Sequence, residues 1–422
     1  MAIRERLSPA PGQIDGLSIN CAHSRFVYNI ALEQRNYWTK ELRAGGLPTV
    51  SRYDQQKSLS EARKHTWLKD GSSAVQQGAL MDLDRAFKNF FRNPKHFGYP
   101  SFRRKFQNEG FTVRDNKVRR LSRKWGEILV PKVGWVRFRA TRLWADIASC
   151  KSARVKLDRS GRWWVSFVAP QPIFVKEASG AVVGVDVGIA NSVTTSDDAH
   201  LSMPATLTPG EKGRLLRLQR KMARQVKGSN RRAATRLKIA RLKAKQVTRR
   251  KDWIEKTTTG LVRDYDLIGI EDLKITSMTR SARGTVEIPG TNVPQKAGLN
   301  REILNQSWGL FRQRLTDKAT AAITPTFVVA VNPANSSRRC HACGNTGKGN
   351  RESQATFHCV VCGHVAHADV NAAKNIRDLA VASLKRQSEI EPLDMRCLDD
   401  GGVAVRPPMK RQPAHKLVGT GS

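Results

Sequence analysis

Four of the seven cysteines lie within 23 residues and carry the strongest chemical signal in the chain. Their spacing is Cys340-x2-Cys343-x15-Cys359-x2-Cys362, and a glycine follows the second cysteine of each pair. Each CxxC pair places two thiolates on one tight turn, so two such turns can close a tetrahedron around Zn²⁺ and leave no open coordination position. An iron–sulfur site and a redox pair are the alternatives. The closed set of four sulfur ligands favours one structural zinc ion in a zinc ribbon.

Three carboxylates form a second, weaker constellation. Asp186 lies in an apolar segment that begins at residue 182, Glu271 ends the apolar run 267–271, and Asp369 opens a helical segment. On neighbouring elements of one α/β sheet, these side chains could hold two Mg²⁺ ions, or Mn²⁺ in their place, for in-line hydrolysis of a phosphodiester. Each has an ordinary interpretation as well: Asp369 as a helix N-cap, Glu271 as a strand-end surface residue and Asp186 as a turn residue.

The charge of the chain predicts a polyanionic partner. Its 422 residues include 74 Lys and Arg against 36 Asp and Glu, a formal net charge of +38. The excess is densest at 211–251, where 17 Lys and Arg accompany a single acid, Glu211. Apolar spacing there predicts two helices joined at 227–230, and such a hairpin repels itself unless phosphates neutralise it. We therefore expect nucleic-acid contacts from the hairpin residues Arg217, Arg220, Lys221, Arg224, Arg231, Arg232, Arg249 and Arg250.

The elements that must position these groups indicate an α+β multidomain protein. Helical periodicity dominates the start of the chain, period-2 alternation follows, and an α/β region with strands near residues 182, 267 and 327 contains the acids. Gly, Ser and Pro punctuate 276–300, which predicts a mobile loop before a helix at 304–322. The predicted units are a barrel-like β unit at 1–15 and 95–178, a helical unit at 16–94, an α/β unit at 179–335 and 364–385, the zinc ribbon at 336–363, and a loose tail at 386–422.

Composition also bears on location. The N-terminus has no apolar signal region, and no uninterrupted apolar run approaches 18 residues, so we expect no membrane partner. One cysteine cluster with three scattered cysteines fits a reducing compartment better than a disulfide scaffold. A cytoplasmic location in a prokaryotic cell is the expectation.

Three segments resemble the RuvC motifs of the TnpB family of transposon-encoded proteins, to which the compact type V CRISPR effectors are related. They are Gly184-Val-Asp186-Val-Gly188, Ile270-Glu271-Asp272-Leu273 and His367-Ala-Asp369-Val-Asn371-Ala-Ala. The zinc ribbon lies between the second and third motifs, as it does in that family. The resemblance covers about residues 3–380 and includes the further segments 22–29, 83–91, 98–102, 129–134, 306–309 and 350–359.

This resemblance implies a nuclease that an RNA guides to DNA beside a short flanking motif. The α/β unit would be an RNase H-like RuvC domain, the helical unit a recognition lobe and the β unit a wedge domain. Asp186, Glu271 and Asp369 would be the metal-binding catalytic acids. Gln76 and Gln77 fall where the family reads the flanking duplex, so their amides could contact base edges. The implied partners are a guide RNA, double-stranded target DNA and the displaced single strand; the oligomeric state is left open.

The sequence therefore predicts an RNA-guided DNA endonuclease with a two-metal RuvC site. Asp197 and Asp272 lie nearby, but neither falls on a motif position. Three alternatives stay open: a miniature type V CRISPR effector that uses a crRNA, an RNA-guided DNA binder that acts as a repressor, and a guide-free transposition accessory protein. The complete set of acids favours cleavage over binding alone.

Overall fold

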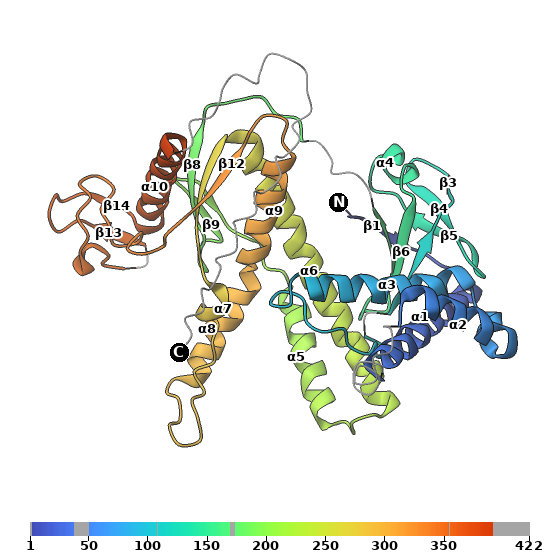
Figure 1. The fold of residues 1–422 in the computed structure, drawn as a ribbon. Coiled ribbons are helices and arrows are strands. Elements are labelled where there is room, and N and C mark those ends of the chain that lie inside the picture. Colours follow the sequence, from blue (N-terminus) through green and yellow to red (C-terminus); the bar gives the residue numbers. More distant parts are fainter. Residues whose placement is uncertain (1, 38–49, 108, 169–173, 354, 391–422) are drawn as a thin grey trace, which may run out of the picture.

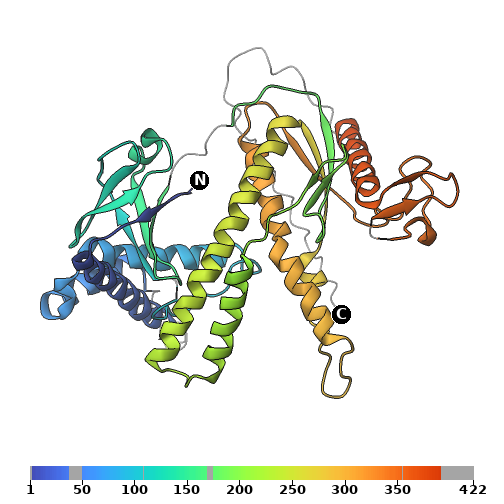
Figure 2. The ribbon, with the colours of Figure 1, turned by 180° about the vertical axis from the view of Figure 1, so that it is seen from behind.

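The computed structural model describes residues 2–37, 50–107, 109–168, 174–353 and 355–390. It has two α+β halves, and a long helical hairpin that belongs to the C-terminal half lies between their sheets (Figures 1 and 2). The N-terminal half holds one sheet with its helices, and the C-terminal half holds a second sheet, the hairpin and the cysteine cluster. None of the described helices combines the length and the apolar character needed to cross a membrane.

The N-terminal half is built on a seven-stranded antiparallel sheet, curled into a half barrel. Its order is β2-β6-β7-β1-β5-β4-β3, so the first strand of the chain lies at the centre, hydrogen-bonded to both β5 and β7. The buried faces of the strands share one apolar core that includes Phe111, Phe138 and Phe167. The strands are β1 (Ala2–Leu7), β2 (Gly110–Arg114), β3 (Val118–Arg120), β4 (Trp125–Val130), β5 (Gly134–Arg139), β6 (Ser152–Leu157) and β7 (Trp163–Val168).

Three helices pack together against this sheet. Their shared core includes Leu32, Leu80, Leu83 and Phe87, at the helical spacing expected of one apolar stripe. The first helix begins at Pro11, so the predicted unit boundary at residue 15 falls inside it. The elements are α1 (Pro11–Tyr37), α2 (Arg52–His65), the short 3₁₀ turn Trp67–Asp70 and α3 (Ser73–Arg92), while α4 (Trp144–Ala148) lies between strands.

The C-terminal half is a five-stranded mixed sheet with helices on both faces. Its order is β10-β9-β8-β11-β12, and β8, β11 and β12 run parallel. Val183 and Ile268 face α6 and α9 and share a core with Ile254, Phe311 and Leu315. The opposite face is covered by α10. The strands are β8 (Val182–Asp186), β9 (Val193–Thr195), β10 (His200–Leu201), β11 (Leu267–Glu271) and β12 (Phe327–Val331); the helices are α6 (Asn230–Asp264), α9 (Trp308–Ala321) and α10 (Ala368–Ile390).

Two glycines let α10 lie unusually close to the sheet. Gly184 and Gly269 are register partners on β8 and β11, and both face the helix. A Cβ added at Gly184 would lie 1.9 Å from the carbonyl oxygen of Ala373, and one at Gly269 would lie 2.9 Å from that of Ile376. Only a hydrogen in place of a side chain permits this approach.

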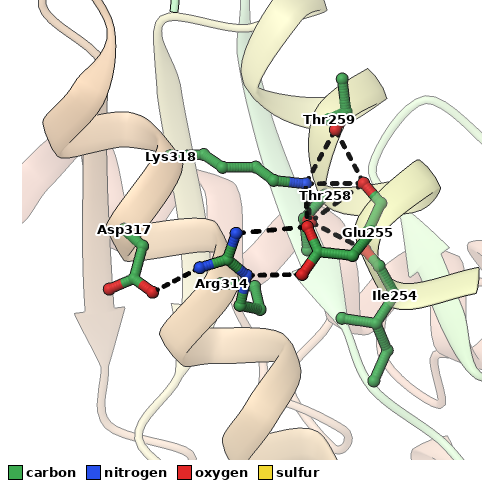
Figure 3. Close-up of polar contacts among 7 residues, drawn as sticks. All are labelled: Ile254, Glu255, Thr258, Thr259, Arg314, Asp317 and Lys318. Atoms are coloured by element: carbon green, nitrogen blue, oxygen red, sulfur yellow. Dashed lines mark hydrogen bonds and ion pairs between the residues drawn. The ribbon is translucent and has the colours of Figure 1, made fainter. Parts of the chain in front are cut away.

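A polar cluster fastens α9 to α6 on the other face (Figure 3). The guanidinium of Arg314 donates to both carboxylate oxygens of Glu255, at 2.6 and 3.2 Å. The ammonium of Lys318 pairs with the same carboxylate at 3.0 Å and donates to the hydroxyls of Thr258 and Thr259. Burial would raise the pKa of Glu255, but the hydrogen bonds from Arg314 and Lys318 outweigh it and lower the pKa. The network fixes α9, which follows β11 and precedes β12.

The basic segment forms two helices where the apolar spacing predicts them. Helix α5 (Pro209–Arg224) begins at a capping box in which Thr208 and Glu211 exchange hydrogen bonds, and α6 begins where Ser229 accepts from the N–H of Arg232. The helices pack against each other as the hairpin seen in Figure 2.

The segment between β11 and β12 differs from the sequence prediction. The predicted loop 276–300 contains the end of α7 (Ile275–Met278) and half of α8 (Val293–Gln306). The helix expected across 304–322 is interrupted at Ser307, whose φ of 57° is left-handed and ends α8 before α9 begins. Of the predicted tail, residues 386–390 belong to α10, and 391–422 lie outside the described residues.

Candidate functional site

Strand geometry places Asp186 and Glu271 side by side on one face of the sheet. They are the last residues of the parallel strands β8 and β11, whose register pairs Val185 with Ile270. Because successive side chains on a strand point to opposite faces, and Val185 and Ile270 face α6 and α9, both acids lie on the face covered by α10. They therefore meet at the carboxyl edge of the sheet.

Helix α10 brings the third acid to the same edge. Ala373 lies over Gly184, and Ile376 and Ala380, farther along the helix, lie over Gly269. Helix α10 thus crosses from β8 to β11. Its first turn contains Asp369, which accepts a hydrogen bond from Asn191 in the loop after β8 and acts electrostatically on Asp186, so the third acid lies near the carboxyl end of β8.

The electrostatics agree with this convergence. Burial and then the negative charges of Glu271 and Asp369 raise the pKa of Asp186, while Arg351 lowers it, and the net value is about 7. Burial also raises the pKa of Glu271. The charges of Glu271 and Asp369 therefore make Asp186 harder to ionise, which is the expected behaviour of a carboxylate gathered with others for a cation that balances them.

Three polar side chains orient the outer acids. The hydroxyl of Ser336 donates to Glu271 Oε1 at 2.5 Å, Asn191 Nδ2 donates to Asp369 Oδ2 at 3.3 Å, and Arg351 Nη2 lies 3.4 Å from Asp369 Oδ1. Sequence reasoning assigned none of them a role. Ser336 and Asn191 stand in loops without a spacing signal, and only Arg351 lay in a segment with family resemblance.

The carboxylates fit hard divalent cations, but not as ligands of one shared ion in this arrangement. In the described part of the chain, the only group of three or more His, Cys, Asp or Glu ligand atoms within 4.8 Å of one another is the cysteine cluster. The acids are therefore more open than a single-ion cage. Carboxylate oxygens are the donors that Mg²⁺ and Mn²⁺ prefer.

The two nearby acids are occupied elsewhere. Asp272 pairs with Arg312 at 2.5 Å, and Asp197 accepts from the hydroxyl of Tyr265 at 2.7 Å. Asp272 directly follows Glu271, so by strand alternation its side chain lies on the opposite face of the sheet, where it pairs with Arg312 of α9. Both arrangements agree with their exclusion from the motif positions.

The four predicted cysteines converge, with geometry that fits zinc. The Sγ atoms of Cys340 and Cys362 are 3.7 Å apart, those of Cys343 and Cys359 are 3.6 Å apart, and all four lie within 4.8 Å. A Zn–S distance of about 2.3 Å in a tetrahedron requires sulfur separations of about 3.8 Å. The set is complete, so a zinc ion held here would be structural.

Two matching turns carry the cysteines. The N–H of Gly344 donates to Cys340 O, and the N–H of Gly363 donates to Cys359 O, both at 2.9 Å. Both glycines have positive φ, 78° and 70°, which a side chain would disfavour. Backbone N–H groups, that of Cys362 foremost, lower the pKa of the Cys359 thiol and favour the thiolate that a metal binds. The short strands β13 (Thr356–His358) and β14 (Val365–His367) complete the ribbon.

The eight hairpin cations predicted to contact nucleic acid fall into two groups. Five are exposed and form no ion pair with any carboxylate among the residues described: Arg217, Arg220, Lys221, Arg224 and Arg231.

The other three use their guanidinium groups within the protein. Arg232 donates to the carbonyls of Met222 and Gln225 and so closes the hairpin turn. Arg249 pairs with Glu211 at 2.5 Å, and Arg250 donates to Ser307 Oγ at 3.0 Å. The exposed group is the one available to a phosphate backbone.

The two glutamines predicted to read the flanking duplex differ sharply. Gln77 is exposed on α3. Gln76 is fully buried: its Nε2 donates to Leu68 O at 2.8 Å and lies 2.9 Å from His23 Nδ1, and Arg63 donates to its Oε1. The expectation for Gln76 is therefore wrong in this structure, because its amide is already satisfied inside the helical core.

Comparison with known proteins identifies matching family models and a similar fold. The family model OrfB_IS605, described as "Probable transposase", matches residues 167–282, and the Cas12f1-like TNB domain matches residues 308–376. A solved structure, "Cryo-EM structure of the Cas12f1-sgRNA-target DNA complex", has a similar fold, with a TM-score of 0.52 and 15% identity over 87% of this chain and 82% of that one.

Two relatives align along most of both chains. The "Putative RNA-guided DNA endonuclease InsQ" of Escherichia coli K12 is 38% identical over 83% of this chain and 85% of its own length. The "Putative RNA-guided DNA endonuclease" of Streptomyces pristinaespiralis is 30% identical over 93% of this chain and 92% of its own length. At this identity and coverage, the chain belongs to the TnpB family.

Proposed function

We propose that Asp186, Glu271 and Asp369 are the catalytic acids of an RNA-guided DNA endonuclease of the transposon-encoded TnpB type. Family membership makes the chain such an endonuclease. The observation that supports this site for the chemistry is the convergence of the three acids, in which burial and then the charges of Glu271 and Asp369 raise the pKa of Asp186 to about 7. The mixed sheet, with α10 across the acids' face, is consistent with the RNase H-like architecture that the sequence predicts.

Each acid has a distinct place in the proposed mechanism. The charges of both Glu271 and Asp369 act on Asp186, so Asp186 would be the acid that helps to hold either metal ion. Ser336 holds Glu271, and Asn191 holds Asp369, so both outer carboxylates are oriented before substrate arrives. Two Mg²⁺ ions, or Mn²⁺ in their place, would supply activation of the attacking water and stabilisation of the leaving oxygen.

Charge supports the proposed nucleic-acid partners. The net charge of +38 and the five exposed hairpin cations suit the backbone of a guide RNA and its duplex with target DNA. Sequence would be read by base pairing, while the protein reads a short flanking motif on double-stranded DNA. The displaced single strand would be the substrate of the acids.

The test begins with the RNA that co-purifies when the protein is expressed with its native flanking DNA. We expect one discrete structured RNA with a variable 3′ segment. With that RNA, Asp186→Ala should abolish cleavage and keep guide-dependent DNA binding. Heterogeneous host RNA alone, or cleavage by the Asp186→Ala variant, would contradict the proposal.

A miniature type V CRISPR effector is the second candidate. The match of residues 308–376 to the Cas12f1-like TNB domain favours it specifically. The origin of the bound RNA separates the two: a transposon end supports the TnpB type, and a repeat array supports the CRISPR effector.

A further inference from the structure

Two buried asparagines on α10 have no part in the chemistry described so far. Asn371 is fully buried and Asn375 is 4% exposed, and they lie one helical turn apart on the helix that begins beside Asp369. Buried carboxamides persist where their donors and acceptors are used. Both face the segment 336–341, which connects β12 to the first zinc cysteine.

Their hydrogen bonds hold the backbone on both sides of Cys340. Asn371 Oδ1 accepts from the N–H of His341 at 3.0 Å, and its Nδ2 donates to Arg339 O at 2.8 Å. Asn375 Nδ2 donates to the same Arg339 carbonyl at 2.7 Å. The first cysteine turn is therefore docked directly on α10.

The same contacts lead to the outer acids. Asn375 Nδ2 also donates to Ser336 O at 3.0 Å, and the Ser336 hydroxyl donates to Glu271 at 2.5 Å. Asn371 is two residues from Asp369 in the first turn of the helix. One continuous set of hydrogen bonds thus links the neighbours of a cysteine ligand to Glu271, and the helix that carries both asparagines also carries Asp369.

We propose that Asn371 and Asn375 are positioning residues that couple the metal-bound conformation of the cysteine turn to the geometry of Glu271 and Asp369. The inference rests on the proposed function in taking these acids as the divalent-metal site. Zinc ligation fixes the backbone of the cysteine turn, and the hydrogen bonds of the two amides hold α10 and Ser336 in a fixed position relative to that backbone. The zinc ribbon is then part of the support of the acids as well as a separate module.

The first test measures Mn²⁺ binding to the full-length, RNA-free protein by the EPR signal of free Mn²⁺. The double variant Asn371→Ala, Asn375→Ala should keep one zinc per chain and an unchanged circular dichroism spectrum. Its Mn²⁺ affinity should fall about tenfold or more, the effect typical of residues that orient metal ligands. Unchanged Mn²⁺ affinity in the folded double variant would overturn the proposal.

Asn350→Ala is the matched control. Asn350 is also fully buried, but its side chain bonds within the ribbon, to Arg338 O, Asn345 O and the N–H of Val360. With zinc bound, this variant should keep its Mn²⁺ affinity within about twofold, well below the tenfold effect expected of positioning residues. An equal loss in this control would show that any lesion in the ribbon acts in the same way, and would overturn the specific role of the two α10 residues.

The second test removes the zinc. Cys343→Ser, at an exposed zinc ligand, should weaken Mn²⁺ binding in the wild-type background. In the double asparagine variant the same substitution should cause little further loss of Mn²⁺ affinity, because the hydrogen bonds between α10 and the cysteine turn are already absent. Additive losses would contradict the coupling. If the double variant fails to fold, Ser336→Ala removes a single hydroxyl from the same connection and should itself lower Mn²⁺ affinity; unchanged affinity there overturns the proposal.

Asp186→Asn separates this inference from the proposed function. It should abolish the tight Mn²⁺ site. If it does not, the acids are not the metal site and the proposed function fails. If it does, while the asparagine variants bind Mn²⁺ normally, only the coupling is rejected.

Discussion

Replacing Gly184 with alanine tests how the fold positions Asp369. The new Cβ would lie 1.9 Å from Ala373 O, and an ordinary contact begins at 3.4 Å, so α10 must retreat by about 1.5 Å unless the strand moves instead. Overpacking of this kind costs about 1–3 kcal/mol of unfolding free energy. A displacement of about 1 Å in a catalytic group costs on the order of 100-fold in rate. We therefore expect Gly184→Ala to lose about 1–3 kcal/mol of unfolding free energy and to cleave DNA about 100-fold more slowly.

The assay compares urea unfolding with single-turnover cleavage at saturating guide RNA and metal. Gly269→Ala should have a smaller effect, because its Cβ would come no closer than 2.8 Å to any atom of the helix. Gly260→Ala in α6 is the control: nothing lies within 4 Å of its Cβ, so it should leave cleavage intact and stabilise the protein by about 0.5–1 kcal/mol. If Gly184→Ala kept wild-type stability and cleavage rate, the close approach of α10 to the sheet could not be what positions Asp369.

Three further predictions concern the acids and the nucleic-acid contacts. Because burial and the charges of Glu271 and Asp369 raise the pKa of Asp186 to about 7 in the fold, the metal-free wild type should lose stability as pH rises from about 4 to 7. Over the same range the stability of Asp186→Asn relative to wild type should increase by up to about 1.4 kcal/mol per pKa unit, measured by urea unfolding at each pH, and a pH-independent difference would contradict the raised pKa of Asp186. The flanking-motif prediction is checked by cleavage of a DNA library with randomised flanking sequence. Gln77→Ala should change the preferred motif, whereas Gln76→Ala, at a buried amide, should lower the free energy of unfolding and leave the motif unchanged. A changed motif in Gln76→Ala and an unchanged one in Gln77→Ala would favour an alternative conformation of α3. Arg217→Ala and Arg220→Ala should each lower the slope of log affinity against log salt for RNA by about 1, and unchanged slopes would place the RNA elsewhere.

The residues predictable from sequence are those that local pattern specifies. The cysteines are predictable because their ligand spacing is contained in 23 residues, Asp186 because a carboxylate within an apolar strand segment is costly unless it is paired, and Glu271 because it ends an apolar strand. The sequence places Asp186 in mid-strand, whereas β8 ends at it, and the register that pairs Val185 with Ile270 puts both acids on one face. Their mutual approach to Asp369 is consistent with the predicted site, although the assignment of the acids as catalytic stays a proposal.

What could not be predicted depends on packing between distant segments. Ser336 and Asn191 contact the acids across 65 and 178 residues of sequence, and nothing in their own neighbourhoods marks them. Gln76 and Gln77 are adjacent on one helix, so only the tertiary structure decides which faces the core. Likewise the break at Ser307 follows from a left-handed backbone that the sequence does not specify, since serine has no preference for it.

The central position of β1 has a consequence for synthesis on the ribosome. Residues 2–7 emerge well before one of their sheet partners, β7, which ends at Val168. At about 5–20 residues per second, roughly 10 seconds or more must pass before that partner has been made. Until then Ile3 and Leu7, buried in the finished sheet, lack the β7 side of their core. Co-translational folding of the N-terminal half must therefore wait for its last strand, and the nascent chain is a natural client for chaperones that shield apolar segments.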